Sequence, residues 1–211
     1  ENRFEQYLFE FLNIGNDNFI VLNFHADRYN NELFSVIDSK GDIKRKLFKQ
    51  SKIEAQKSGL LVDYRNLSVF KSVLYFTYPY CDTIYSMDNK ENVRRIYYID
   101  YKNRKIPGNL LDIGDNALTW EKKILGLNDF LHTSAIGVTE NHIYIGSINK
   151  AFQAFFTLYS KKDKHILTAH KLVDDMFLRG NEIMITARNM PHEMDGNDIL
   201  WPLDPEYLIN G

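Results

Sequence analysis

The sequence of 211 residues lacks the features that mark several large classes of protein. It contains a single cysteine, Cys81, which excludes an internal disulfide framework, and no Cys and His spacing typical of a zinc site occurs. No apolar run approaches the roughly 18 residues of a membrane-spanning helix. With 26 Lys and Arg against 28 Asp and Glu, the net charge of −2 provides no basic field. We therefore expect no nucleic-acid partner and no transmembrane segment in this chain.

Motifs of catalysis are also missing from the sequence. There is no G-x-S-x-G elbow, no H-E-x-x-H and no glycine loop that could hold a phosphate. Cys81 has no base near it in the sequence, so it is interpreted as an inert packing residue. His165 and His170 are five residues apart on one expected strand and would face opposite sides, which disfavours a metal pair. The sequence therefore disfavours an enzymatic function without deciding the question.

Aromatic residues are plentiful, with 13 Tyr and 14 Phe, and they gather in short strand-like runs. The richest stretch, residues 73–100, predicts strands at 73–78, 83–88 and 93–100, because Val, Ile, Tyr and Phe suit a pleated, half-buried surface. Pro79 and the polar residues 88–90 supply the breaks between them.

Similar groups of strands recur on both sides of this stretch. The expected strands are 7–12, 19–24, 33–38 and 43–48 in a first unit, 67–70 and the three above in a second, 134–138, 142–147, 155–160 and 165–173 in a third, and 176–178 and 182–187 in a fourth. Four-stranded antiparallel meanders repeating every ~40–50 residues predict the blades of a β-propeller. A β-sandwich or barrel is the alternative.

We therefore predict an all-β fold with about three blades and part of a fourth. The chain is interpreted as a single propeller domain, or a fragment of one, with units at approximately 4–50, 64–103, 132–174 and, in part, 175–211. Residues 115–131 place apolar side chains at helical spacing and predict one short helical insertion between blades. Such a helix would cover a sheet edge or, in the sharper interpretation, a binding face.

Three pieces of sequence carry a family resemblance: YCDTIYSMD, YYIDYKNRKIPG and the late EMDGNDILWP. Their motifs lie at residues 82–85, at 97–100 with 106–107, and at 195–196 with 201–202. With these motifs the chain resembles the uncharacterised six-bladed β-propeller family of Bacteroides-type bacteria, over about residues 19–201.

The resemblance implies an exported protein, often a lipoprotein, that faces the periplasm or the cell surface. No signal or lipid-anchor motif occurs in this chain. Three units and part of a fourth cannot close a six-bladed ring, which needs roughly 250 residues at ~40 per blade. We expect either a piece of a longer chain or a relative that covers its exposed edges by pairing.

Propeller geometry places the loops after the second strands and those between blades on one face, where we expect the function. The candidate binding residues there are His25, Asp27, Arg28, Tyr29, Tyr78, Tyr80, Asp82, Asn149, Lys150, Arg188 and His192. Loops on a rigid scaffold commonly carry binding groups, and tyrosines supply flat apolar area with a polar end. The expected ligand is a glycan, a peptide or a partner protein.

An alternative function is a calcium-dependent, lactonase-like propeller hydrolase or lyase. Residues 192–198 form the densest cluster of possible oxygen ligands, and Asp195 and Asp198 are the candidate metal residues. That function needs carboxylates or amides from at least three units at the axis, whereas the expected first strands carry almost none, with Glu10 the exception. The sequence therefore favours the binding module, with no cofactor other than possible Ca²⁺.

Overall fold

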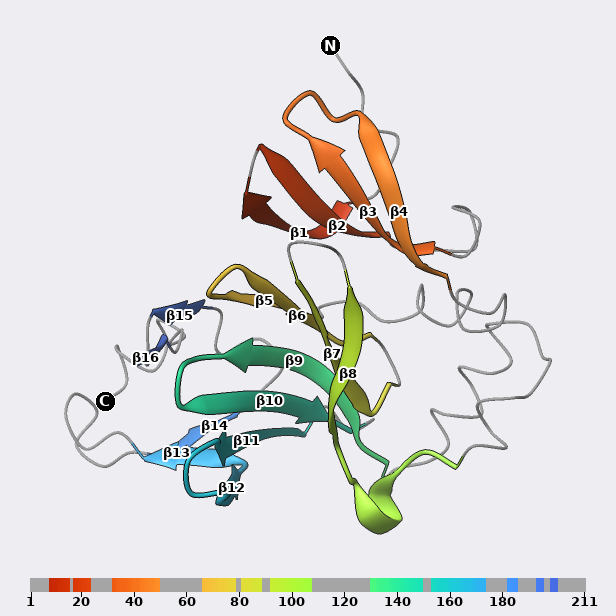
Figure 1. The fold of residues 1–211 in the computed structure, drawn as a ribbon. Helices are drawn as coiled ribbons and strands as arrows, with labels where there is room; N and C mark the ends of the chain where they lie inside the picture. Colours follow the sequence, from red (N-terminus) through yellow and green to blue (C-terminus); the bar gives the residue numbers. More distant parts are fainter. Residues whose placement is uncertain are drawn as a thin grey trace.

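The fold is built from successive antiparallel meanders, which follow one another from top to bottom in Figure 1. The computed structural model describes the chain at residues 8–15, 17–23, 32–49, 66–78, 81–88, 92–107, 130–149, 153–173, 182–185, 193–195 and 198–200. Within these ranges, three sheets have four strands each and two have two strands each. The predicted all-β fold with four-stranded antiparallel blades is confirmed.

Each four-stranded sheet is one blade, with its strands hydrogen-bonded in chain order. Blade 1 has β1 (Leu8–Gly15), β2 (Asn18–Asn23), β3 (Glu32–Asp38) and β4 (Ile43–Lys49); blade 2 has β5 (Leu67–Phe70), β6 (Val73–Phe76), β7 (Thr83–Met87) and β8 (Val93–Tyr98); blade 3 has β9 (His132–Val138), β10 (His142–Ile148), β11 (Ala154–Ser160) and β12 (Ile166–Ala169). The two-stranded sheets are β13 (Lys171–Val173) with β14 (Glu182–Met184), and β15 (Glu193–Asp195) with β16 (Asp198–Leu200).

The tight turns follow from the residues that the sequence puts there. Between β5 and β6, Lys71 and Ser72 adopt φ of 49° and 59°, the left-handed pair that joins two antiparallel strands through two residues. Between β3 and β4, the Asp38 carboxylate accepts the N–H groups of Lys40 (2.9 Å) and Asp42 (3.0 Å). Such side-chain acceptors replace the backbone partners that a turn loses.

The first strands of the three blades lie beside one another, β1 against β5 and β5 against β9. The Val138 N–H donates to the Ser68 hydroxyl (3.1 Å), which joins the inner strands of blades 2 and 3. This is the arrangement of propeller blades around an axis, with each first strand innermost.

Blades 1 and 2 are held together by a cluster of large apolar side chains. Phe34 meets Phe76 edge-on with ring centroids 4.8 Å apart, and Phe76 stacks on Tyr85 at 5.2 Å. Phe48 completes the cluster, 5.5 Å from Phe76 and 5.0 Å from Tyr85. Around these rings pack Ile20, Leu22, Leu33, Val36 and Leu47 from blade 1 and Leu67, Leu74, Cys81 and Met87 from blade 2. The apolar faces of the two blades therefore share one core.

The chain differs from the sequence-based prediction at residues 165–173, which were expected to form one strand. The stretch bends at His170: β12 pairs with β11, whereas β13 pairs with β14 in another sheet. Continuous β-propensity could not show this change of partner, because pairing is a tertiary property. His165 precedes β12 rather than lying on it, so the argument about opposite strand faces does not apply to the two histidines.

Other predicted elements fall where the structure gives no description. Residues 115–129 of the helical insertion predicted at 115–131, the strand at 176–178 and the end of the strand at 182–187 lie outside the described residues. Leu131, the last residue of that predicted helix, instead forms a parallel β-bridge with Lys105. The hairpin of β15 and β16 was not predicted as strands; the sequence there was interpreted as a cluster of oxygen ligands.

The aromatic cluster predicts a large effect of removing its central ring. Phe76→Ala should lower the free energy of unfolding by roughly 3–5 kcal/mol, because the Phe76 side chain is almost fully buried and its loss leaves a cavity. Urea denaturation of the wild type and the variant measures the difference. The control is Val69→Ala in the same blade, at a side chain that is 39% exposed, with an expected cost below about 1 kcal/mol. Equal costs for both substitutions would contradict a shared core of blades 1 and 2.

Candidate functional site

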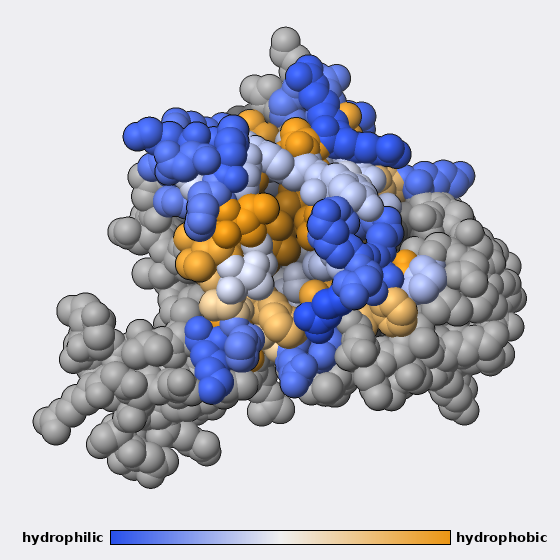
Figure 2. Space-filling model, turned by 90° about the horizontal axis from the view of Figure 1, so that it is seen from below, coloured by the Kyte–Doolittle hydropathy of each residue, from blue (hydrophilic) through white to orange (hydrophobic). Residues whose placement is uncertain are grey.

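A groove of about 590 Å³ opens between blades 2 and 3. Its floor is one face of blade 3, formed by β10, β11 and β12, and its wall is the end of β8 with the residues that follow it. Figure 2 views the molecule from below, where apolar residues surround a hollow and hydrophilic residues lie around them. The tyrosines and phenylalanine of the lining are Tyr97, Tyr98, Tyr101, Phe155 and Tyr159.

The floor of the groove arises from strand alternation. Every second residue of β10, β11 and β12 faces blade 2, and Ile145, Thr157 and Thr168 lie directly opposite one another across the three strands. The hydroxyls of Thr157 and Thr168 are 3.0 Å apart and hydrogen-bonded. This row of the floor therefore changes from apolar on β10 to polar on β11 and β12.

The wall of the groove is fixed by contacts that cross from blade 2 to blade 3. The guanidinium of Arg104, in the 3-10 turn η2 (Lys102–Arg104), lies over the Phe155 ring at 4.7 Å. The Leu131 N–H donates to the Arg104 carbonyl (2.9 Å), just before β9 begins. These contacts hold the wall against the floor, so the groove is present before any ligand arrives.

Tyr101 connects the wall to the inner part of blade 3. Its hydroxyl is hydrogen-bonded to Thr133 Oγ1 (2.7 Å) and Ser147 Oγ (3.0 Å), and burial raises the pKa of Tyr101 to about 12. Thr133 also donates to the Cys81 carbonyl (3.4 Å). Sequence reasoning missed this residue, because nothing in the pattern distinguishes Tyr101 from its neighbours Tyr97 and Tyr98.

Asp82, one of the predicted binding residues, lies beside the groove in an ion pair with Lys105. The Lys105 ammonium also donates to the Tyr98 hydroxyl (2.8 Å), and the two partners raise the pKa of Lys105 above its usual range. The Asp82 carbonyl accepts the Ile99 N–H (2.7 Å). Asp82 therefore positions the wall, with its charge balanced by Lys105.

A small cavity of about 20 Å³ adjoins the groove, with room for one water molecule. Cys81, Asp82, Tyr101, Lys105 and His132 line it. Burial lowers the pKa of His132 to about 4 and raises that of the Cys81 thiol. At neutral pH both groups are uncharged, and a thiol in this state fits the interpretation of Cys81 as a packing residue.

The loop between β6 and β7 sends its predicted site residues to different places. The Tyr78 ring packs at the interface of blades 1 and 2, 5.5 Å from the Phe48 ring and 6.1 Å from the Tyr85 ring, and burial raises its pKa. Asp82 lies instead on the side of the groove. Asn149, in the corresponding loop of blade 3, is buried and donates to the Gln153 side chain (3.0 Å).

The remaining candidates are not brought together by the described structure. His25, Asp27, Arg28, Tyr29, Tyr80, Lys150, Arg188 and His192 lie outside the described residues. Asp195 and Asp198 face each other as Cα partners at the end of the β15–β16 hairpin. Among the described residues, no group of three or more His, Cys, Asp or Glu could hold a metal ion. Calcium at Asp195 and Asp198 stays a prediction.

No helix within the described ranges is long and apolar enough to cross a membrane.

Comparison with known proteins identifies the family. Residues 1–189 match the family model DUF5128, described as a 6-bladed β-propeller. The chain belongs to the DUF5128 family. The resemblance drawn from the three sequence motifs is therefore confirmed.

Two solved Bacteroides structures resemble this DUF5128 chain. One is a predicted exported protein from Bacteroides fragilis, with a TM-score of 0.57 and 14% identity over 78% of this chain and 46% of the other. The other is a DUF4221-family protein from Bacteroides vulgatus, with a TM-score of 0.45 and 13% identity over 74% of this chain and 49% of the other. The chain spans about half the length of each. No curated protein matches it.

The half-buried His132 that lines the small cavity predicts a dependence of stability on pH. The pKa of about 4 for folded His132 is below the ~6.5 of an unfolded chain, so the unfolded state takes up the proton first as the pH falls. His132 should therefore remove up to about 3 kcal/mol of stability as the pH falls from about 6.5 to 4, and nothing more below that range.

Urea unfolding at a series of pH values, for the wild type and for His132→Gln, measures this term. The variant should show a flatter pH profile over that range. The control is His165→Gln, at an exposed histidine, which should keep the wild-type profile. A profile unchanged by His132→Gln would show that folding does not lower the pKa of His132.

Proposed function

We propose that this protein is an exported, ligand-binding propeller and that the groove between blades 2 and 3 is its binding site. The observation that carries the proposal is the groove itself: about 590 Å³, with apolar and aromatic walls and a small number of polar groups. Binding sites for small ligands and peptide side chains commonly have this size and lining.

The exposed tyrosine on the wall favours recognition over packing. Tyr98 is 60% exposed, and its hydroxyl is held by Lys105 (2.8 Å). A tyrosine ring fixed at its polar end offers a flat apolar face at little further cost in side-chain entropy. Such a face suits the apolar side of a sugar ring or a peptide side chain, so the ligand class is a glycan, a peptide or a segment of a partner protein.

The location outside the cytoplasm is inferred from the family and from one structural neighbour. The Bacteroides fragilis protein is predicted to be exported, and it shares the propeller fold with this chain. A binding propeller of the periplasm or cell surface is consistent with that neighbour.

Thermal-shift measurements can test the groove as a binding site. The panel contains cello-, xylo- and chito-oligosaccharides and synthetic peptides of either charge. We expect one class to raise the melting temperature, because a ligand at a hundred times its Kd adds about 2.7 kcal/mol. Tyr98→Ala should weaken that ligand about tenfold, since aromatic anchors in a binding site are commonly worth 1–2 kcal/mol or more.

The matched control is Ile43→Ala, which truncates an exposed apolar residue on the fourth strand of blade 1. It should leave the affinity unchanged. A panel without any shift would overturn the proposed function, and a shift that Tyr98→Ala leaves unchanged would move the site away from this groove.

A further inference from the structure

We propose that the ligand is an extended acidic peptide that adds as a new strand to the outer edge of blade 3, along β12, with its apolar side chains in the mouth of the groove. This inference rests on the proposed function and specifies its ligand. It follows from the backbone and side chains of β12 and from the charges of the residues that flank it.

The backbone of β12 has an open edge. In the described part of the chain β12 pairs only with β11, and the register of the two strands is unbroken. The His165 carbonyl accepts the Ser160 N–H (2.9 Å), so these two residues form a hydrogen-bonded pair between β11 and the start of β12. In an antiparallel ladder, hydrogen-bonded and non-hydrogen-bonded pairs alternate, so the N–H and C=O groups of Ile166 and Thr168 point away from β11. The hydrogen bond between the Thr157 and Thr168 hydroxyls is consistent with this assignment, because side chains lie closest together at non-hydrogen-bonded pairs.

The side chains of the same two residues line the groove. Ile166 is 62% exposed and Thr168 is exposed, and both belong to the floor. Leu167, on the opposite face of the strand, is 55% exposed. A strand added to this edge would form its hydrogen bonds to Ile166 and Thr168 and cover apolar surface on both faces.

The fourth strand of each blade forms an outer edge, and β12 is the one of the three that carries no charged side chain. β4 carries Lys44, Arg45 and Lys46, and β8 carries Arg94 and Arg95. Charged side chains on an edge strand discourage another strand from pairing with it. The sequence of β12, ILTA, has no charge at all. Of the three comparable edges, this one is suited to accept a strand.

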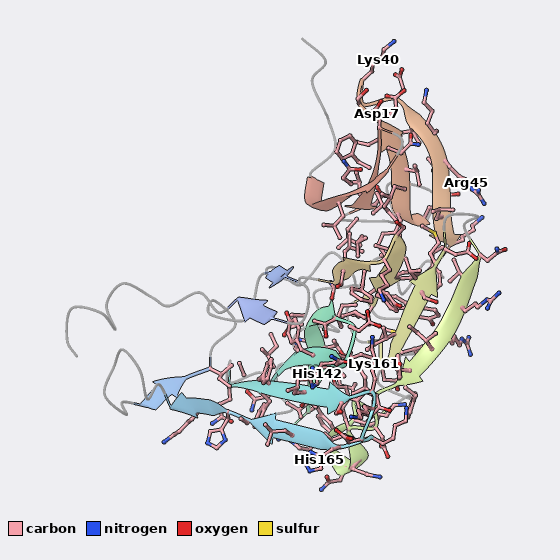
Figure 3. All side chains as sticks on the ribbon, turned by 60° about the vertical axis from the view of Figure 1, so that its left-hand side comes forward. Asp17, Lys40, Arg45, His142, Lys161 and His165 are labelled. Carbon is pink, nitrogen blue, oxygen red and sulfur yellow. The ribbon has the colours of Figure 1, made fainter. Side chains whose placement is uncertain are left out.

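The charges flanking β12 specify an acidic partner. Residues 161–171 contain four lysines and one aspartate, in a chain whose net charge is −2. In Figure 3, Lys161 and His165 are labelled at blade 3, whereas Lys40 lies at the far end of the molecule. The Lys161 ammonium donates to the Thr139 carbonyl, so Lys162 and Lys164 are the lysines of the turn that can face a strand at β12. A peptide with an apolar centre and glutamates at its ends would complement this edge, and its affinity should fall as salt is added.

Titration calorimetry with synthetic peptides tests strand addition directly. The probe is acetyl-Glu-Glu-Val-Thr-Ile-Thr-Val-Glu-Glu-amide, with N-methyl groups on either the Val and Ile residues or the Thr residues. Only one of these alternating sets can direct its N–H groups at β12. One set should therefore weaken binding about tenfold or more, since two hydrogen bonds are lost, and the other should leave it within about twofold. Equal effects of the two sets would overturn strand addition.

Variants of the protein locate the peptide. Ile166→Asn should weaken binding at least about tenfold, while Ile43→Asn, at an exposed isoleucine on the edge strand β4, should leave it unchanged. Equal effects of these two substitutions would place the peptide elsewhere.

The contribution of the lysines is tested with a charge-reversal variant and a control variant. Lys162→Glu with Lys164→Glu should reduce both the affinity and its salt dependence, whereas Lys40→Glu, in the corresponding turn of blade 1, should change neither. A lysine-flanked version of the peptide that binds as tightly as the acidic one would overturn the acidic specificity.

The two proposals fail in different ways. If the peptide does not bind and an oligosaccharide binds in a manner that depends on Tyr98, strand addition is overturned and the groove remains a binding site. If neither binds, the proposed function is overturned as well.

Discussion

The packing of flat blades depends on filling the space between two sheets whose mean planes lie ~10 Å apart. Between blades 1 and 2 this is done by aromatic side chains from both sides: Phe34 and Phe48 from blade 1 meet Phe76 and Tyr85 from blade 2. Phe48 adopts a φ of 61°, which a bulky residue rarely does, and its three ring contacts offset that strain. The interface is closed because large rings reach across it.

Blades 2 and 3 are joined at their inner side by hydrogen bonds. There Ser68 accepts from Val138, and the Tyr101 hydroxyl is bonded to Thr133 and Ser147. Farther out, the Tyr159 ring of β11 meets the Tyr97 ring of β8 edge-on, with centroids 5.9 Å apart, whereas the neighbouring floor residues Thr157 and Thr168 have short side chains. The groove is the consequence: it lies where short side chains of the floor stand between the contacts that join the two sheets.

Much of the fold could be predicted from the sequence, and the groove could not. The strand at residues 67–70 and the start of the strand at 73 agree with β5 and β6, because strand propensity and turn residues are local signals. The groove depends on pairs such as Tyr101 and Ser147, 46 residues apart, and on the short side chains of Thr157 and Thr168 on the floor. A local sequence pattern cannot reveal a contact between residues so far apart in the chain. For the same reason Tyr78 could be placed on a loop but not assigned to the core that it joins.

Because of its position, the groove can form whether or not the propeller ring is closed. A site on the propeller axis needs residues from every blade, whereas both walls of this groove belong to blades 2 and 3, which the chain contains in full. Arg104 over Phe155 and the Tyr101 hydrogen bonds hold the two walls at a fixed spacing, so a ligand would not have to assemble them. Recognition at such a site can therefore be a property of two neighbouring blades. Loss of Arg104, which does not line the groove, should affect binding through the spacing of the walls rather than through contact with the ligand.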